Sequence, residues 1–246
     1  MPSLSNKVAL ITGGSRGIGA AITKRLARDG AAVAFTYSSA KAKADEVVRA
    51  IESAGGKALA ISADSASPDA VRAAVTQTVN SLGRLDILVN NAGLAVMAPL
   101  SDFKLEDFDR LVTVNIRAVF VASQEASRHM SDGGRIITIG STNADRMPFP
   151  GGSVYAMTKA AVAGLTRGMS RDLGPRGITV NAVQPGPVDT DMNPASGPFA
   201  DSLRALMALP RYGKPEEIAA LVSHLASSEA AFITGACLTI DGGFAA

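Results

Sequence analysis

The chain has 246 residues, of which 47% are hydrophobic, and its 24 lysines and arginines nearly balance its 22 aspartates and glutamates. This length fits one large α/β domain or two small domains. The net charge of +2 is spread along the chain without basic blocks, so the pattern does not favour a nucleic-acid partner. Because Cys237 is the only cysteine and His129 and His224 are the only histidines, we expect no intrachain disulfide and no metal site.

The first residues lead directly into an apolar segment, without the basic region, long apolar core and cleavage site of a signal peptide. No apolar run reaches the roughly 18 residues that a membrane span requires. We therefore expect a soluble, cytoplasmic protein without a membrane partner.

Short apolar runs alternate with longer stretches of helical spacing, which is typical of βα units around a parallel sheet. The predicted strands are Val8–Ile11, Ala32–Thr36, Ala58–Ser62, Ile87–Asn90, Arg135–Ile139, Thr179–Val183 and Cys237–Ile240. The predicted helices are Gly17–Asp29, Lys41–Ala54, Pro68–Leu82, Lys104–Met130, Val154–Leu173 and Pro215–Ala226. Because the strands are apolar nearly throughout, both faces of the sheet should be buried. This pattern predicts a single doubly wound α/β domain over residues 1–246.

One connection, from Gln184 to Lys214, is much longer than the others and carries five prolines. It includes a helix-like piece around Phe199 to Leu209. A connection of this length in a compact domain is usually a lid or a binding loop. We therefore predict that residues 186–212 form a substrate loop.

A glycine-rich turn, Thr12-Gly13-Gly14-Ser15-Arg16-Gly17-Ile18-Gly19, joins the first strand to the first helix. Glycines allow a tight turn and close approach of a ligand, and a helix N-terminus favours a phosphate. The candidate cofactor-binding residues here are Gly13, Ser15, Arg16, Gly17, Ile18 and Gly19. One alternative is a βα turn without a ligand. A second is a hydrolase nucleophile elbow at Ser15, but too few residues precede it to supply an oxyanion-hole strand.

The residues at the end of the second strand should indicate which cofactor binds, because an acidic side chain there would bind the ribose 2′-hydroxyl of NAD. Here the sequence reads Tyr37-Ser38-Ser39 and offers no carboxylate. The two serine hydroxyls and the Arg16 guanidinium instead suit a 2′-phosphate. The pattern favours NADP over NAD, with a solvated surface charge as the alternative interpretation of Arg16.

Tyr155 and Lys159 are four residues apart in a predicted helix and therefore lie on one face of it. An unperturbed tyrosine titrates near ~10, so a neighbouring positive charge would make its phenol a better proton donor at neutral pH. Ser141 ends the fifth predicted strand, at the edge where open α/β sheets bind ligands. The three side chains are therefore candidates for one catalytic site.

Six motifs occur in the order and approximate spacing of one family: Thr12-Gly13-x-x-x-Gly17-x-Gly19, Asn90-Asn91-Ala92-Gly93, Asn115, Ser141, Tyr155-x-x-x-Lys159 and Pro185-Gly186. Over essentially its whole length, the chain resembles the classical short-chain dehydrogenases/reductases. The resemblance implies a Rossmann domain with a seven-stranded parallel sheet flanked by helices. It also implies that the protein binds NAD(P) and forms a homotetramer or homodimer.

The resemblance implies a role for each catalytic residue. Tyr155 would protonate the substrate carbonyl oxygen, and Ser141 would hydrogen-bond to it. Lys159 would bind the nicotinamide ribose and lower the pKa of Tyr155, while Asn115 would hold a water of a proton relay. Alternatively, the Asn115 amide only satisfies backbone groups. Thr142 is a rival to Ser141, since many family members place the serine thirteen residues before the tyrosine.

The resemblance also implies further cofactor contacts, to which Tyr155 and Lys159 would add. They are Asp64, Ser65, Asn91, Ala92, Gly93, Pro185, Gly186, Val188 and Thr190. For Asp64 the alternative is an ordinary residue of the loop before a helix.

Apolar residues that we expect to line the substrate pocket are Leu94, Val96, Met147, Phe149, Met192, Phe199 and Met207. Such a lining suits a neutral ketone or aldehyde. We predict an NADPH-dependent carbonyl reductase acting on a small molecule. A 3-oxoacyl-[acyl-carrier-protein] reductase is the second possibility, although the segment before the fifth strand lacks the basic cluster expected to dock an acidic carrier. A third is a dinucleotide-binding regulatory protein with little turnover.

Overall fold

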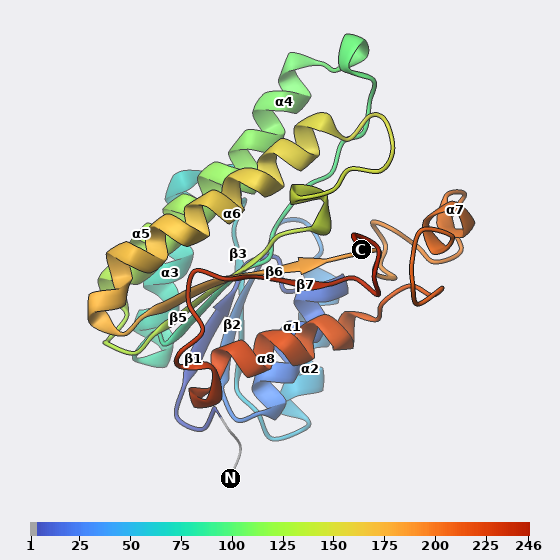
Figure 1. Ribbon diagram of the computed structural model, residues 1–246. Coiled ribbons are helices and arrows are strands. Elements are labelled where there is room, and N and C mark those ends of the chain that lie inside the picture. Colours follow the sequence, from blue (N-terminus) through green and yellow to red (C-terminus); the bar gives the residue numbers. More distant parts are fainter. Residues whose placement is uncertain (1–3) are drawn as a thin grey trace.

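The computed structural model describes residues 4–246, which fold around one seven-stranded parallel sheet with the strand order β3-β2-β1-β4-β5-β6-β7 (Figure 1). The strands are β1 Val8–Ile11, β2 Ala32–Tyr37, β3 Ala58–Ser62, β4 Ile87–Asn90, β5 Arg135–Ile139, β6 Thr179–Pro185 and β7 Cys237–Ile240. The predicted fold class and strand positions are confirmed, with β2 and β6 ending one and two residues later than expected.

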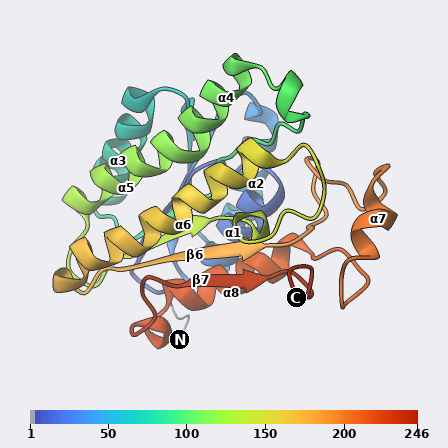
Figure 2. The same cartoon turned by 45° about the horizontal axis from the view of Figure 1, so that its top comes forward.

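Helices cover both faces of the sheet. The α-helices are α1 Gly17–Arg28, α2 Lys41–Glu52, α3 Pro68–Leu82, α4 Leu105–Val112, α5 Ala118–His129, α6 Ser153–Leu173, α7 Ala200–Arg204 and α8 Pro215–Ala226. Figure 2 shows α3, α5 and α6 on one face and α1, α2 and α8 on the other. None of the helices in residues 4–246 is both long enough and apolar enough to cross a membrane.

Neighbouring residues of each central strand enter two separate apolar cores. Ala9 and Ile11 pack with the apolar side of α1 and α8, whereas Leu10 packs with that of α3 and α5. All four residues of β1 are buried. Because side chains alternate between the two faces of a strand, a strand covered on both sides must be apolar at every position. This is the pattern on which the sequence prediction relied.

The single helix predicted for Lys104–Met130 is wrong. The segment forms α4 and α5 with a π-helical turn, Thr113–Arg117, between them. The N–H of Ala118 bonds to the carbonyl of Thr113, five residues back. Such a turn changes the face on which later residues lie without ending the helix, so the apolar pattern still looks helical. Single π turns of this kind occur frequently at functional sites.

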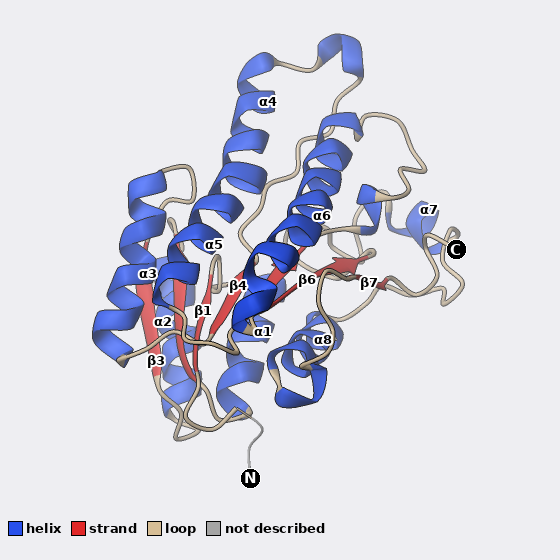
Figure 3. Cartoon of the chain, turned by 60° about the vertical axis from the view of Figure 1, so that its left-hand side comes forward, coloured by secondary structure: helices blue, strands red, loops and turns tan. Residues whose placement is uncertain are grey.

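The carboxyl ends of the strands lie together at one edge of the sheet. The strand order runs outward in one direction from β1 to β3 and in the other from β4 to β7, so the switch point lies between β1 and β4. Open α/β sheets bind ligands at such a point. Figure 3 shows the long connection with α7 beyond the same ends of β6 and β7. We call residues 186–212 the lid.

Candidate cofactor and active site

The glycine-rich turn after β1 is too tightly packed for larger residues. Gly13 has a φ of 68°, and a Cβ on Gly19 would lie 2.2 Å from the Gly13 carbonyl oxygen. The Gly13 N–H donates to Thr36 Oγ1 at 2.9 Å, which ties the turn to β2. The turn leads directly into the N-terminus of α1, where free N–H groups favour an anion.

Asn91 fixes the turn from the neighbouring strand. Its Nδ2 donates to the carbonyls of Thr12 and Gly13, both at 3.0 Å. Thr12 Oγ1 in turn accepts from the N–H groups of Asn91 and Ala92. The segment 91–93 therefore lies beside the glycine-rich turn, where the Asn91 amide holds that turn, and its cofactor contacts stay a prediction.

The other predicted residues for the adenosine end of the cofactor surround this turn. Arg16, Ser38 and Ser39 are exposed, whereas Tyr37 is half-buried. Asp64 is exposed, and its Oδ1 accepts from the Ala66 N–H at 2.9 Å, so its carboxylate shapes the loop before α3. This contact matches the alternative interpretation of Asp64.

Tyr155 and Lys159 lie on the same face of α6, as the spacing predicted. Lys159 Nζ is 5.7 Å from the centroid of the Tyr155 ring and donates to the Ile139 carbonyl at 3.0 Å. Ser141 hydrogen-bonds to Tyr155. Thr142 is buried and donates from Oγ1 to the Pro185 carbonyl at 3.3 Å. The structure thus brings Ser141, and not Thr142, to the tyrosine.

Burial dominates the electrostatics of this cluster. It raises the pKa of the Tyr155 phenol, and the hydrogen bond with Ser141 lowers that pKa in part. Burial also lowers the pKa of Lys159 from 10.5 to about 8. Ser141 is thus one group that lowers the pKa of Tyr155, while the Lys159 ammonium points to a main-chain oxygen, and the expected effect of Lys159 on that pKa stays a prediction.

Asn115 lies in the π-helical turn and is buried. Its Nδ2 donates to Thr158 Oγ1 at 3.1 Å, and the Thr158 hydroxyl donates to the Tyr155 carbonyl at 2.8 Å. The side chain thus connects α6 to the loop that follows β4, where it also bonds to Leu94. These contacts match the alternative in which the amide satisfies backbone groups.

Asn143 is a site residue that the sequence analysis missed. Its Oδ1 accepts from the Ser141 hydroxyl at 3.2 Å, and its N–H donates to Ser141 Oγ at 3.1 Å. Its Nδ2 donates to the Arg146 carbonyl at 3.2 Å. The only sequence signal is its place two residues after Ser141, where asparagine often bonds to nearby backbone.

The lid starts at the carboxyl end of β6 and rests on several parts of the site. Gly186 N–H donates to the Ile240 carbonyl at 3.1 Å, and Val188 forms a bridge with Gly213. A Cβ on Gly17 would lie 3.3 Å from the Thr190 methyl group, so Thr190 packs on the glycine-rich turn. Thr190 therefore lies beside the predicted cofactor site, while the cofactor contacts of Pro185, Gly186 and Val188 stay predictions.

The apolar residues predicted to line the pocket differ widely in exposure. The side chains of Met192 and Phe199 are 60% and 74% exposed, whereas Met207 is buried. Sequence alone could not separate these positions, because apolar residues of a loop follow no fixed period.

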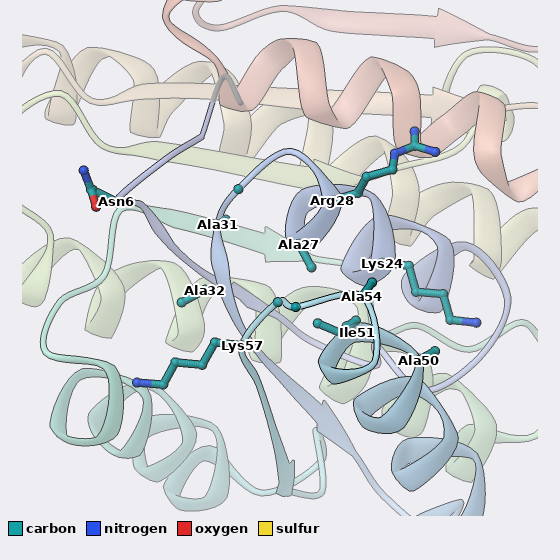
Figure 4. A pocket seen from close by; sticks show the side chains of 13 residues that line it. Asn6, Lys24, Ala27, Arg28, Ala31, Ala32, Ala50, Ile51, Ala54 and Lys57 are labelled. Carbon is teal, nitrogen blue, oxygen red and sulfur yellow. The ribbon is translucent and has the colours of Figure 1, made fainter. Parts of the chain in front are cut away.

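A groove of about 610 Å³ lies away from this site, between the C-terminal ends of α1 and α2 (Figure 4). It is lined mainly by alanines and glycines and contains none of the predicted site residues. In the part of the chain that the structure describes, no group of three or more His, Cys, Asp or Glu side chains could hold a metal ion.

Comparison with known proteins places this arrangement in a family. Residues 13–245 match the family model described as enoyl-(acyl carrier protein) reductase. A short-chain dehydrogenase/reductase from Serratia marcescens is 62% identical, with a TM-score of 0.98 over 99% of this chain and 100% of that one. A short-chain dehydrogenase from Burkholderia cenocepacia in complex with NADP is 55% identical, with the same TM-score and the same coverage of both chains.

A curated relative, the cyclic-di-GMP-binding biofilm dispersal mediator protein of Escherichia coli, is 51% identical over 100% of both chains. The full-length matches indicate the same family as the glycine-rich turn and the cluster of Ser141, Tyr155 and Lys159. The chain belongs to the short-chain dehydrogenase/reductase family.

Proposed function

We propose that this protein is an NADPH-dependent reductase that converts a ketone or aldehyde to an alcohol, with Tyr155 as general acid and base. The observation that carries the proposal is the cluster of half-buried Tyr155 with buried Ser141 and Lys159 at the carboxyl edge of the sheet, beside a turn built for a phosphate. A carbonyl substrate placed there would meet a proton donor and a hydrogen-bond donor from the same side.

The residues present fit a dinucleotide cofactor. The glycine-rich turn leaves no room for a Cβ on Gly19, and it presents the N-terminus of α1 to a phosphate. NADPH is favoured over NADH because no carboxylate follows β2, where Ser38 and Ser39 are exposed near the exposed Arg16. The relative from Burkholderia cenocepacia, which was solved with NADP, supports the same choice.

Each residue of the cluster has a distinct task in the proposed reduction. Bound NADPH supplies the hydride that reaches the carbonyl carbon. Tyr155 gives its proton to the carbonyl oxygen, and the Ser141 hydroxyl, which in the structure donates to Asn143 Oδ1, turns to donate to the same oxygen as charge develops on it. Burial raises the pKa of Tyr155 and so keeps the phenol protonated until it is needed. Alcohol oxidation would run these steps in reverse, with Tyr155 as the base.

We propose that Lys159 supports Tyr155 and binds the nicotinamide ribose. With a pKa lowered to about 8, its ammonium exchanges a proton more readily than an exposed lysine near neutral pH. Asn115 holds the segments that carry Leu94 and Thr158, and a water-relay role for it remains part of the proposal.

The test is an NADPH oxidation assay over a panel of ketones, aldehydes and acetoacetyl thioesters, with NADH in parallel. We expect turnover of at least one simple carbonyl with NADPH and much less with NADH. Tyr155→Phe should bind NADPH normally and lose about 100-fold or more in kcat, since it removes only the proton donor. Tight binding of NADPH with no turnover across the panel would refute the proposal.

Reduction of a carrier-bound 3-oxoacyl group is the second candidate, and a relative described as a 3-oxoacyl-[acyl-carrier-protein] reductase, 40% identical over 99% of this chain, supports it. An acidic carrier protein needs free cations near the site. Arg176 bonds to the carbonyl of Ser127 and pairs with Asp132, while Arg128 pairs with Glu125. Both cations also flank the start of β5, at the opposite edge of the sheet from Tyr155, which favours simple carbonyls. Higher kcat/KM for acetoacetyl thioesters than for simple ketones would reverse this order.

Cyclic-di-GMP binding is a third candidate, based on the name of the Escherichia coli relative, which is 51% identical. Calorimetric titration with cyclic-di-GMP, alone and after saturation with NADPH, tests it. Binding that NADPH abolishes would indicate a shared site, and binding that persists would indicate a separate one.

We also propose that the protein is a cytoplasmic homotetramer or homodimer. Leu100, Leu105 and Met157 are exposed around a groove of about 390 Å³ between α4 and α6, and an apolar surface of this kind suits a second copy of the chain. Light scattering on the purified protein gives the oligomeric state. A mass near the 25.1 kDa of one chain would refute this part.

A further inference from the structure

An ion pair joins the beginning of the lid to the first turn of α2. Lys43 Nζ lies 2.7 Å from Asp191 Oδ2, although the two residues are 148 positions apart in the chain. Thr190, immediately before Asp191, packs on Gly17 of the glycine-rich turn. Asp191 therefore lies where the lid, the glycine-rich turn and α2 meet.

Asp191 faces positive charge from two of these elements. Lys43 contacts its carboxylate, and Arg16 of the glycine-rich turn acts on it through its charge. Both cations hold the pKa of the Asp191 carboxyl below its ordinary value, with Lys43 the stronger cause. The carboxylate thus occupies a place at which two cations favour an anion.

This place adjoins the region where a 2′-phosphate should bind. In Rossmann folds, the residues after β2 and a nearby arginine contact the 2′-position of the adenosine ribose. Here those residues are Ser38, Ser39 and Arg16, and Lys43 follows four residues after Ser39 on the first turn of α2.

We propose that Lys43 contributes to selectivity for NADPH and that the Asp191 carboxylate competes with the 2′-phosphate for Lys43 and Arg16. When NADPH binds, its 2′-phosphate replaces Asp191 as the partner of these two cations. This inference rests on the proposed cofactor site. Lys43 and Asp191 side chains are 52% and 63% exposed, so their pair is weak and a phosphate of higher charge can displace it. NADH carries no 2′-phosphate, so the pair persists when NADH binds.

The test measures the dissociation constants of NADPH and NADH from the change in nicotinamide fluorescence. Lys43→Gln should weaken NADPH about threefold to tenfold, because one charged partner of the phosphate is lost. Asp191→Asn should tighten NADPH about twofold to fivefold, the size expected of an exposed charge pair. Neither substitution should change NADH binding by more than about twofold, and both NADPH effects should shrink at high salt.

Two matched controls come from the same elements. Lys41 pairs with Asp45 within α2, and Asp201 pairs with Arg204 within the lid. Lys41→Gln and Asp201→Asn should therefore leave the affinities for both cofactors unchanged. If a control changes NADPH affinity as much as its partner variant, selectivity reflects total charge and the inference is wrong.

The remaining outcomes also separate the two proposals. If Asp191→Asn leaves NADPH affinity unchanged or lowers it, Asp191 is no competitor. If both variants alter NADPH and NADH equally, the ion pair only supports the lid and does not select the cofactor. If the unaltered protein binds neither cofactor, the proposed function itself fails.

Discussion

The side chain of Asn115 bonds twice to the main chain of Leu94: its Oδ1 accepts from the Leu94 N–H at 2.8 Å, and its Nδ2 donates to the Leu94 carbonyl at 2.9 Å. One asparagine of the π-helical turn therefore holds the loop after β4 as a neighbouring strand would. The same Nδ2 reaches Thr158, one turn from Tyr155 on α6.

Replacing Asn115 should therefore affect stability as well as activity. Asn115→Ala leaves the N–H and carbonyl of Leu94 without these partners in a part-buried place, which costs about 1–3 kcal/mol in the free energy of unfolding. Urea denaturation measures this loss. Asn115→Asp keeps the acceptor for the Leu94 N–H but places a buried carboxylate oxygen against the Leu94 carbonyl, so it should lose at least as much. Unchanged stability in both variants would mean that water replaces the amide.

The choice between Ser141 and Thr142 leads to a second prediction. Ser141→Ala should lower kcat about 10-fold or more, because it removes a donor to the substrate oxygen, and should cost about 1 kcal/mol in stability, because the Asn143 N–H loses its partner. Thr142→Val should keep most of the activity and destabilise the fold by about 1 kcal/mol, since its hydroxyl bonds to the Pro185 carbonyl in a buried place. Steady-state kinetics and urea denaturation of both variants decide between the two residues. A large loss of kcat in Thr142→Val but not in Ser141→Ala would assign the catalytic role to Thr142.

Lys159 should make the fold more stable in alkali. Burial lowers its pKa from 10.5 to about 8, so below pH 8 its charge is buried at a cost. Between pH 8 and 10 the folded state releases this proton while the unfolded state still holds it, so the contribution of Lys159 to stability rises by up to about 3 kcal/mol. Urea denaturation across this range, in the protein and in Lys159→Met, isolates the effect. Parallel profiles would contradict it.

Gly19 and Gly168 have very different surroundings, and this difference gives a fourth prediction. Gly19→Ala places a Cβ 2.2 Å from the Gly13 carbonyl oxygen, so the turn must open and NADPH binding should fall about 10-fold or more. Gly168 lies in α6 with no atom within 4 Å of its Cβ position. Gly168→Ala should keep NADPH binding and stabilise the helix by about 0.5–1 kcal/mol. Equal NADPH affinities in the two variants would show that the turn adapts.

Sequence periodicity predicted the strands because each central strand is buried on both faces and therefore apolar throughout. It also placed Tyr155 and Lys159 on one helix face, since four residues make about one turn. It could not predict the π-helical turn around Asn115, whose side chain bonds to Leu94, 21 positions away in the chain. The pair between Lys43 and Asp191 joins residues 148 positions apart, and only the folded lid brings them together.

The strand order of the sheet also determines when the edges of β1 can become paired during synthesis. β1 is made first but lies in the interior of the sheet, and one of its edges pairs with β4, which ends at Asn90. Until that residue has left the ribosome, the apolar strand Val8–Ile11 has an unpaired edge that can join another chain. This open apolar edge of β1 therefore persists in the nascent chain until β4 emerges, and a chaperone that binds extended apolar segments would act on that interval.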